Sequence, residues 1–317
     1  MMNESSYNGS SQFVVPSRVT AVVWCVAFGF TGTLIVTLNV GTLITFAINK
    51  PLRRHGVYSL LNLATADMLL GLVMIPYYTI DVASAILAKQ IVHPQILTTL
   101  RALYITTVVA SLFCLALVSL QRMYATYCPF GYRAKEAKML ASMFTVPWML
   151  AGATSLVFFL LDSVQDQIVI FIQVLFALSL GIILICYIAI FIKVKMRCSR
   201  QRHIDIRDRH LAGTVFMVTA LSLITWIPSI VFHSIYKTQT RGFSFNLQLS
   251  IYLILCTNSL INPIVYLLRM KDFRKALFRL MTKCSAVGMS MSPVHYINST
   301  SRRSSEVRLT SVCFKET

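Results

Sequence analysis

The sequence predicts an all-α membrane protein, a seven-transmembrane helix bundle followed by a short cytoplasmic amphipathic helix. The chain of 317 residues is 56% hydrophobic and only 13% charged, whereas an ordinary soluble domain carries roughly 25% charged residues. Its mean hydropathy is +0.69. Seven apolar stretches reach the ~20 residues that a helix needs to cross a bilayer. A β-barrel would instead show alternating segments of about 10 residues.

The seven predicted spans are residues 19–49, 57–88, 102–121, 139–161, 167–192, 210–236 and 242–268. Six of them contain no Lys, Arg, Asp or Glu, and the span at 57–88 contains only Asp67 and Asp81. The connections are short, 5 to 17 residues, so residues 18–270 form one domain with no inserted soluble part. No repeat typical of transporters built from two inverted halves is visible.

The basic residues predict the orientation. Of the 29 Lys and Arg side chains, 24 fall on the side of the bundle that includes the C-terminus, and such residues stay in the cytoplasm during insertion. Residues 1–17 are therefore expected outside a multi-pass plasma-membrane protein, with glycosylation acceptors at Asn3 and Asn8. The net charge of +18 then reflects topology and contact with membrane lipid rather than nucleic-acid binding.

The cysteines predict that no outer disulfide exists. All eight fall within predicted spans or on the cytoplasmic side, where disulfides are rare.

Asp67 is the most informative polar residue because it lies about ten residues, or ~15 Å, inside the second span. A carboxylate at that depth is costly unless it is paired or hydrated, so it indicates a functional site. The alternative is a structural, hydrogen-bonded Asp. Asp81 lies near the outer end of the span, where it can meet water.

Several motifs fall in the order and depth of one known family. They are Asn39, Leu61 to Asp67 (Leu-Asn-Leu-Ala-Thr-Ala-Asp), Trp148, Tyr187, Trp226-Ile227-Pro228 and Asn262-Pro263-Ile264-Val265-Tyr266. Together they resemble a rhodopsin-like (class A) G-protein-coupled receptor over residues 19–284. The resemblance implies a cell-surface receptor, not an enzyme, that transmits an extracellular ligand signal to a heterotrimeric G protein. Arrestin and receptor kinases are candidate further partners.

The resemblance also assigns roles inside the bundle. Pro228 and Pro263 each remove a backbone hydrogen bond and so create bends at which the inner halves of two spans can pivot, with Trp226 placed to sense a ligand from above. By resemblance, Asp67, Ser111, Asn258 and Asn262, in one polar network with Asn39, would bind Na+ in the resting state. No other metal or cofactor is expected.

On the cytoplasmic side, Gln121 and Arg122 occupy the place of the family's Asp-Arg-Tyr segment. Arg122 is the expected contact for the G protein, with Tyr187 and Tyr266 as switch residues and Pro129 and Phe130 as an apolar contact. In the family the acidic residue beside this arginine helps to hold it inward. Gln121 offers a hydrogen bond but no charge, which leaves Asp208 as the expected resting partner of Arg122.

Residues 271–284 form the predicted amphipathic helix. Phe273, Ala276, Leu277, Leu280 and Met281 repeat on one face, and basic residues occupy the other. Cys284 continues the apolar stripe and is a candidate for palmitoylation. The polar tail, residues 285–317, is expected to be disordered, with a kinase-type motif at Ser304 and Ser305.

The sequence departs from the family at several places. It lacks both cysteines of the usual outer disulfide, and it has Ser179 and Ser222 where a proline and a phenylalanine are common. In lacking this disulfide and this proline, the sequence resembles the melanocortin receptors. Tyr104 stands where monoamine receptors carry an aspartate, and Cys256 stands where opsins carry the retinal-linking lysine.

These positions favour a small peptide, a lipid or a carboxylate over an amine as the ligand. The predicted ligand pocket is lined by Tyr77, Tyr78, Asp81, Arg101, Tyr104, Trp226, His233, Tyr236, Gln248 and Tyr252. Two other functions stay open at this point. One is a seven-span ion translocator or transporter that uses Asp67 as a relay, and the other is a receptor-fold scaffold that has lost G-protein coupling, which Gln121 would permit.

Overall fold

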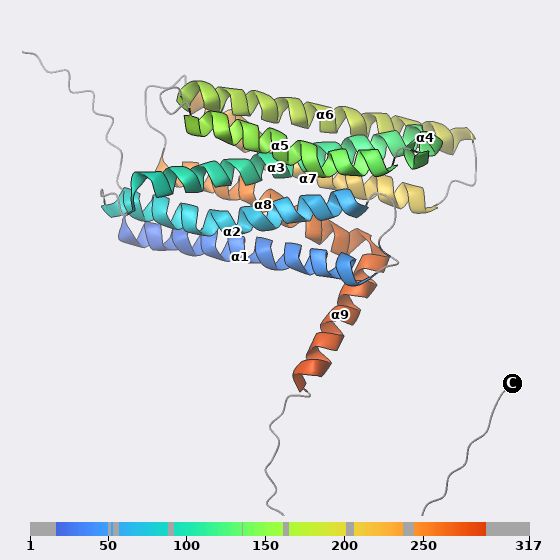
Figure 1. Ribbon diagram of the computed structural model, residues 1–317, viewed down its shortest axis with the longest axis horizontal. Coiled ribbons are helices and arrows are strands. Elements are labelled where there is room, and N and C mark those ends of the chain that lie inside the picture. The colour runs from blue at the N-terminus through green and yellow to red at the C-terminus, as the bar shows by residue number, and fades with distance from the viewer. Residues whose placement is uncertain are drawn as a thin grey trace, which may run out of the picture.

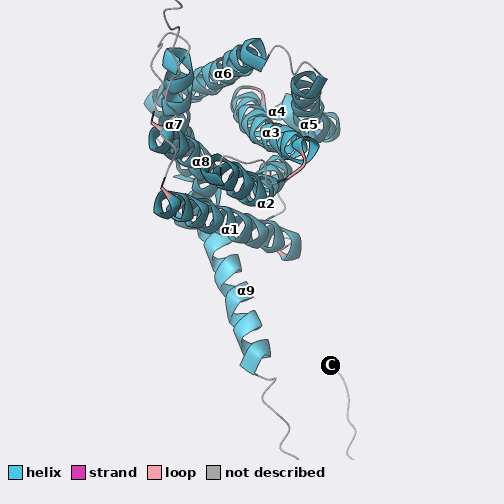
Figure 2. Ribbon diagram, turned by 90° about the vertical axis from the view of Figure 1, so that its left-hand side faces the viewer, coloured by secondary structure: helices cyan, strands magenta, loops and turns pink. Residues whose placement is uncertain are grey.

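The computed structural model describes residues 17–49, 52, 57–87, 92–134, 136–160, 165–200, 206–236 and 244–289. Within these ranges it contains nine helices and no strand. Seven are long: α1 (Arg18–Ile48), α2 (Val57–Leu87), α3 (Pro94–Tyr127), α5 (Glu136–Leu160), α6 (Gln165–Arg200), α7 (Ile206–Tyr236) and α8 (Phe245–Arg269). They lie side by side along the long axis of the molecule (Figure 1) and form one bundle when viewed end-on (Figure 2). The predicted fold class is confirmed.

The helices begin and end at different residues from the predicted spans, chiefly where charge lies inside a helix. α3 extends over Pro94–Tyr127 because Arg101 and Arg122, which bounded the charge-free stretch, are helical. Its first residue is a proline, which suits the first turn of a helix. α6 likewise continues past the apolar stretch to Arg200. A helix needs an apolar surface only where it crosses lipid, so charged turns can extend it into water.

Five of the long helices, α1, α2, α3, α6 and α8, are long and apolar enough over their described residues to cross a membrane. The apolar parts of α5 and α7 within the same described ranges are shorter, Ala141–Val157 and Ala220–Phe232. In α1, Val26 and Phe30 are 64% and 65% exposed on the outside of the bundle, while Asn39 is fully buried. Apolar side chains outside and polar ones inside are what a lipid solvent requires.

Two glycines bring α1 and α2 into close contact. A Cβ atom added at Gly71 would lie 2.9 Å from the carbonyl oxygen of Gly32, and one at Gly32 would lie 2.6 Å from Cγ1 of Ile75. Such distances leave no room for a methyl group. Small residues at helix contacts allow this approach of two backbones in membranes, and it fixes α2, and therefore Asp67, against α1.

Two more helices, α4 (Pro129–Ala134) and α9 (Lys271–Met289), lie at the end of the bundle where α1 terminates, and α9 leaves the bundle at a steep angle (Figure 1). Phe273 is 1% exposed and packs against Phe46 and Tyr266. The sequence predicts that this helix ends at 284, but it continues to Met289. Ser285, Ala286 and Val287 contain no strong helix breaker, so the helix can continue past Cys284.

Candidate functional site: a buried polar centre and the two ends of the bundle

Asp67 lies in the middle of α2 and is completely buried. Its Oδ1 accepts hydrogen bonds from Ser111 Oγ at 2.5 Å and from Ser259 Oγ at 2.7 Å, and its Oδ2 accepts one from Asn262 Nδ2 at 2.8 Å. The donors come from α3 and α8, so one carboxylate joins three helices. Ser259 is absent from the predicted network, although a small hydroxyl three residues before Asn262 shares that residue's helix face.

The other predicted members of the polar network lie around this centre but do not bond Asp67 directly. Asn39 Nδ2 donates to the carbonyl oxygens of Ile35 and Ser259 at 2.9 and 3.1 Å, while its Oδ1 is buried without a partner among the described residues. Asn258 Oδ1 accepts from Thr225 Oγ1 at 3.4 Å. The network therefore ties α1, α2, α3, α7 and α8 together at one depth.

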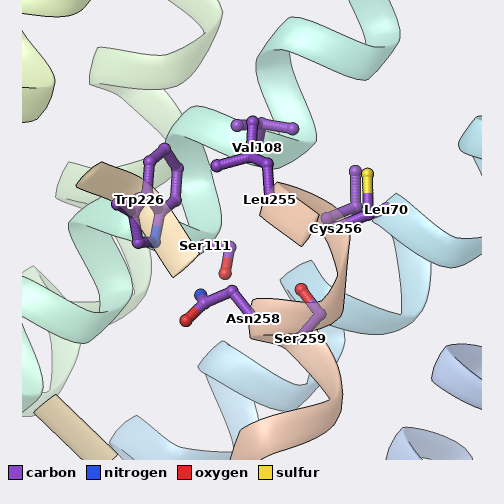
Figure 3. A pocket seen from close by; sticks show the side chains of 8 residues that line it. All are labelled: Leu70, Val108, Ser111, Trp226, Leu255, Cys256, Asn258 and Ser259. Atoms are coloured by element: carbon purple, nitrogen blue, oxygen red, sulfur yellow. The ribbon is translucent and has the colours of Figure 1, made fainter. Parts of the chain in front are cut away.

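Ser111 and Ser259, which bond the carboxylate of Asp67, also line a small cavity. It is lined by Leu70, Val108, Ser111, Trp226, Leu255, Cys256, Asn258 and Ser259 (Figure 3). Its volume is about 10 Å³, which is about what one water molecule needs. Its lining offers two hydroxyls and an amide on one side and apolar groups on the other.

Trp226 lines this cavity and is 2% exposed. Its ring meets that of Phe176 edge-on, with 4.6 Å between centroids, and its Nε1 has no hydrogen-bond partner within the described part of the chain. In Figure 3 the indole nitrogen lies on the side of Ser111 and Asn258. Pro228 in α7 and Pro263 in α8 lie inside their helices, as predicted.

On the side of the cavity nearer the start of α1, a cluster of aromatic rings joins α1, α2, α3 and α8. Tyr78 is 2% exposed, stacks on Phe28 at 3.9 Å and donates a hydrogen bond to the hydroxyl of Tyr104 at 3.0 Å. The Tyr104 hydroxyl is also 3.5 Å from Cys256 Sγ. Tyr77 stacks on Tyr104 at 5.1 Å. The cluster thus brings two other predicted pocket tyrosines, Tyr77 and Tyr78, into contact with Tyr104.

Arg101 is not a lone cation in this region. It interacts with the Tyr77 hydroxyl and lies within electrostatic reach of the Asp81 carboxylate, so the predicted single positive charge has an acidic side chain near it. On α8, Gln248 Nε2 donates to the Tyr252 hydroxyl at 3.3 Å. The backbones of His233 and Tyr236 belong to α7, but their side chains lie outside the described residues.

At the end of α3 next to α4, Arg122 is half-buried and its Nε has no hydrogen-bond partner among the described side chains. It lies close enough to Tyr266 to affect it electrostatically. Ser119 Oγ donates to the Tyr187 hydroxyl at 3.0 Å, which joins α3 to α6. The side chain of Asp208 lies outside the described residues, so its pairing with Arg122 stays a prediction.

Gln121 does not have the contacts that the sequence suggests. The sequence analysis expects its amide to offer a hydrogen bond beside Arg122, but Oε1 accepts from Ser59 Oγ at 2.6 Å and Nε2 donates to the Tyr132 hydroxyl at 2.7 Å. The reason is geometric: neighbours on a helix point about 100° apart. Gln121 therefore faces α2 and α4, and neither Ser59 nor Tyr132 was identified from the sequence. Phe130 in α4 is 86% exposed.

Five predicted modification sites cannot be placed. Asn3, Asn8, Ser304 and Ser305 lie outside the described residues, and so does the side chain of Cys284. The cysteines whose side chains are described, which are Cys25, Cys114, Cys128, Cys186 and Cys256, carry free thiols.

Comparisons with known proteins agree with this arrangement. A family model described as "7 transmembrane receptor (rhodopsin family)" matches residues 38–266. The chain is 26% identical to trace amine-associated receptor 5 of Mus musculus over 308 residues, which covers 87% of this chain and 90% of that protein. It is 23% identical to adenosine receptor A2b of Gallus gallus over 282 residues, 75% of this chain and 82% of that one. With the family model spanning most of the bundle, the chain belongs to the rhodopsin family of seven-transmembrane receptors.

Proposed function

We propose that a small peptide, a lipid or a carboxylate, rather than an amine, activates this receptor through the aromatic cluster around Tyr104. Membership of the family makes the chain a G-protein-coupled receptor of the cell membrane and not an enzyme. The observation that carries the proposal is the hydroxyl of Tyr104, which is bonded to Tyr78 and close to Cys256. An uncharged group thus stands at the centre of the cluster, and an amine would find no free carboxylate there.

The two charges nearby support the same conclusion. Asp81 lies within electrostatic reach of Arg101, so an amine that approached Asp81 would be repelled by the guanidinium. Arg101 has five N–H donors in a planar fork, and the contact with Tyr77 does not use all of them. A ligand carboxylate can therefore bind Arg101 while Asp81 keeps its place. The names of the two relatives refer to amines and adenosine, but 26% and 23% identity do not transfer a ligand.

The test is to screen the expressed receptor against separate pools of amines, carboxylates, short peptides and lipids, with a panel of G-protein readouts. We expect no response to the amine pool. A carboxylate response should be lost in Arg101→Gln and kept in Arg18→Gln, a matched change at the exposed start of α1. A response to the amine pool that Asp81→Asn abolishes would overturn the proposal.

Na+ is the proposed ligand of the polar centre in the resting state. Hard cations prefer oxygen ligands. Ser111, Ser259 and Asn258 offer hydroxyl and amide oxygens to one small cavity, and the two serines also bond the carboxylate of Asp67. Three hydrogen bonds use three of the four lone-pair sites of Asp67, and the serine hydroxyls can turn to leave more. A bound Na+ would stabilise the carboxylate charge and hold α2, α3 and α8 in one packing.

Activation is proposed to proceed as a shift between two packings. A ligand that moves Trp226 would repack the cavity below it, and the bend at Pro228 would let the inner half of α7 swing outward from Arg122. Ligand and G protein both favour the open packing and therefore favour each other's binding.

The remaining finer assignments are part of the same proposal. The end bearing α4 and α9 would face the cytoplasm, because Lys271, Arg274 and Arg279 are exposed on α9. Arrestin and receptor kinases would act on the tail at Ser304 and Ser305. Ion translocation is not favoured, because Asp67 is the one charged side chain that is fully buried in the part of the chain that the structure describes, and a relay needs several.

A further inference from the structure

The first half of α3 cannot be tied to the rest of the bundle by a disulfide. The sequence contains no cysteine between residues 57 and 113 and none between residues 129 and 185. Neither this part of α3 nor the chain between α5 and α6 can therefore supply half of the disulfide that is usual in the family. Yet this part of α3 carries Arg101 and Tyr104, the two residues on which the proposed ligand site depends.

A serine of α5 ties this stretch of α3 instead. Ser155 Oγ donates to the backbone carbonyl oxygen of Ala102 at 2.8 Å, and the Ser155 side chain is 9% exposed. A serine or threonine inside a helix commonly bonds the carbonyl of its own preceding turn, and the neighbouring Thr154 does so by donating to Leu150 at 2.8 Å. Ser155 therefore uses its hydroxyl between two helices, where its neighbour uses one within a helix.

The place of Ser155 follows from the face of α5 on which it lies. Trp148 and Ala151 lie two turns and one turn before it, so the three residues share one face of the helix. Ala151 is fully buried, and Trp148 packs against the same apolar core. Apolar contacts of this kind are not directional, whereas a hydrogen bond requires both a distance and an angle. The Ser155 hydroxyl therefore fixes the rotation and the height of α3 beside α5.

The same stretch of α3 is held on another side by α2. The two helices α2 and α5 pack on different sides of α3 (Figure 2). Tyr78 donates to the Tyr104 hydroxyl at 3.0 Å, and Tyr77 interacts with Arg101. These contacts join side chains to side chains and so orient Arg101 and Tyr104. Ser155 complements them, because it holds the backbone from which both side chains extend.

We infer that Ser155 is a positioning residue for ligand binding: its hydrogen bond fixes the backbone that carries Arg101 and Tyr104, in place of the disulfide that this sequence lacks. The inference rests on the ligand site proposed around Tyr104, and Ser155 itself does not touch the ligand. A site whose donors are in place before the ligand arrives binds it more tightly, because less ordering remains to be done on binding.

The first arm of the test reads the surroundings of Tyr104 without any ligand. The receptor is purified in phosphatidylcholine nanodiscs with meta-fluorotyrosine at position 104, and the fluorine NMR signal is recorded. Ser155→Ala should shift or broaden this signal, because the backbone at Tyr104 is no longer held. The matched control is Thr154→Val, which removes a hydroxyl from a 6% exposed side chain of the same helix. It should leave the fluorine signal unchanged, because that hydroxyl bonds its own helix.

The second arm measures the affinity of the unlabelled receptors for benzoate, a carboxylate whose ring suits the tyrosine cluster. Ser155→Ala should bind benzoate about fivefold more weakly than the wild type, the factor that one hydrogen bond of ordinary net strength gives. Thr154→Val should bind like the wild type, and Ser155→Thr, which keeps the hydroxyl, should restore most of the affinity. Because Ser155→Ala and Thr154→Val each lose one hydrogen bond, similar Tm values with different affinities separate positioning from stability.

An unchanged fluorine signal in Ser155→Ala would overturn the inference, and so would a Ser155→Ala receptor that binds benzoate as tightly as the wild type. Equally weakened benzoate binding in Thr154→Val would reveal a general loss of stability and would overturn it as well. If the wild type binds no benzoate, the proposed carboxylate site fails, and the fluorine signal of Ser155→Ala alone then decides whether Ser155 positions Tyr104.

Discussion

Replacing Asp67 with Asn should make the stability of the receptor insensitive to sodium. In the wild type the carboxylate accepts three hydrogen bonds, from Ser111, Ser259 and Asn262. The amide introduced by Asp67→Asn can still accept from the two serines through its oxygen, while its NH2 group would face Nδ2 of Asn262. One hydrogen bond is then lost or must re-form after Asn262 turns, a cost of about 1 kcal/mol. Without sodium the variant should therefore fold and lose only a little stability.

With sodium the two proteins should differ. A ligand at about ten times its dissociation constant stabilises the folded state by roughly 1.4 kcal/mol. Each kcal/mol shifts Tm by about 2–4 °C in a protein of roughly this size, so the wild type should gain about 3–6 °C. The variant has lost the one carboxylate of the site and should gain nothing.

The assay is thermal unfolding of the purified, ligand-free receptor in NaCl and in choline chloride at equal ionic strength. Asp272→Asn, the same change at an exposed carboxylate in the first turn of α9, is the matched control and should respond to sodium like the wild type. Equal Tm values in both salts for the wild type, or an equal sodium response in Asp67→Asn, would refute the cation site.

Two further predictions concern the close contact of α1 with α2 and the absence of an outer disulfide. Gly71→Ala should lower the free energy of unfolding by about 1–3 kcal/mol, because its methyl group would meet the backbone oxygen of Gly32. The control is Gly152→Ala, where nothing lies within 4 Å of the added methyl group, and it should be neutral or stabilising by up to about 1 kcal/mol. Equal Tm values for the two variants would contradict the close contact of α1 and α2. Mild reductant applied from outside should leave Tm and G-protein binding unchanged, because the described cysteines are free, and a loss of binding that reoxidation restores would reveal an outer disulfide.

Much of the fold could be predicted from the sequence because its signal is strong and local. Long charge-free stretches can satisfy their backbone in lipid only as helices, and all seven predicted spans correspond to long helices in the described part of the chain. The helix ends were harder to predict. Arg101 and Arg122 interrupt the charge-free stretch, yet the helix passes through both, because an arginine near a helix end can reach water or a polar partner.

The polar centre was predicted in part. Asp67, Ser111 and Asn262 meet as the family resemblance implied, but Ser259 was not predicted, since a serine in an apolar helix commonly bonds its own backbone. Gln121 shows why a position within a motif does not fix a contact. Its partners Ser59 and Tyr132 lie 62 and 11 residues away in the sequence, and only the packing of α2 and α4 against α3 brings them together.

The central claim is that the receptor engages a heterotrimeric G protein through Arg122, and one binding measurement tests it most directly. The affinity of nucleotide-free G protein for the receptor in nanodiscs should be compared between the wild type and Arg122→Ala, with Arg18→Ala at the outer end of α1 as the control. Arg122 has an Nε without a partner among the described residues, at the end of the bundle that bears α4, and its planar fork suits the carbonyl groups of a docking segment. We predict that Arg122→Ala loses at least ~10-fold in affinity, or about 1.4 kcal/mol, while Arg18→Ala binds like the wild type. Undiminished binding by a correctly folded Arg122→Ala receptor would contradict the claim.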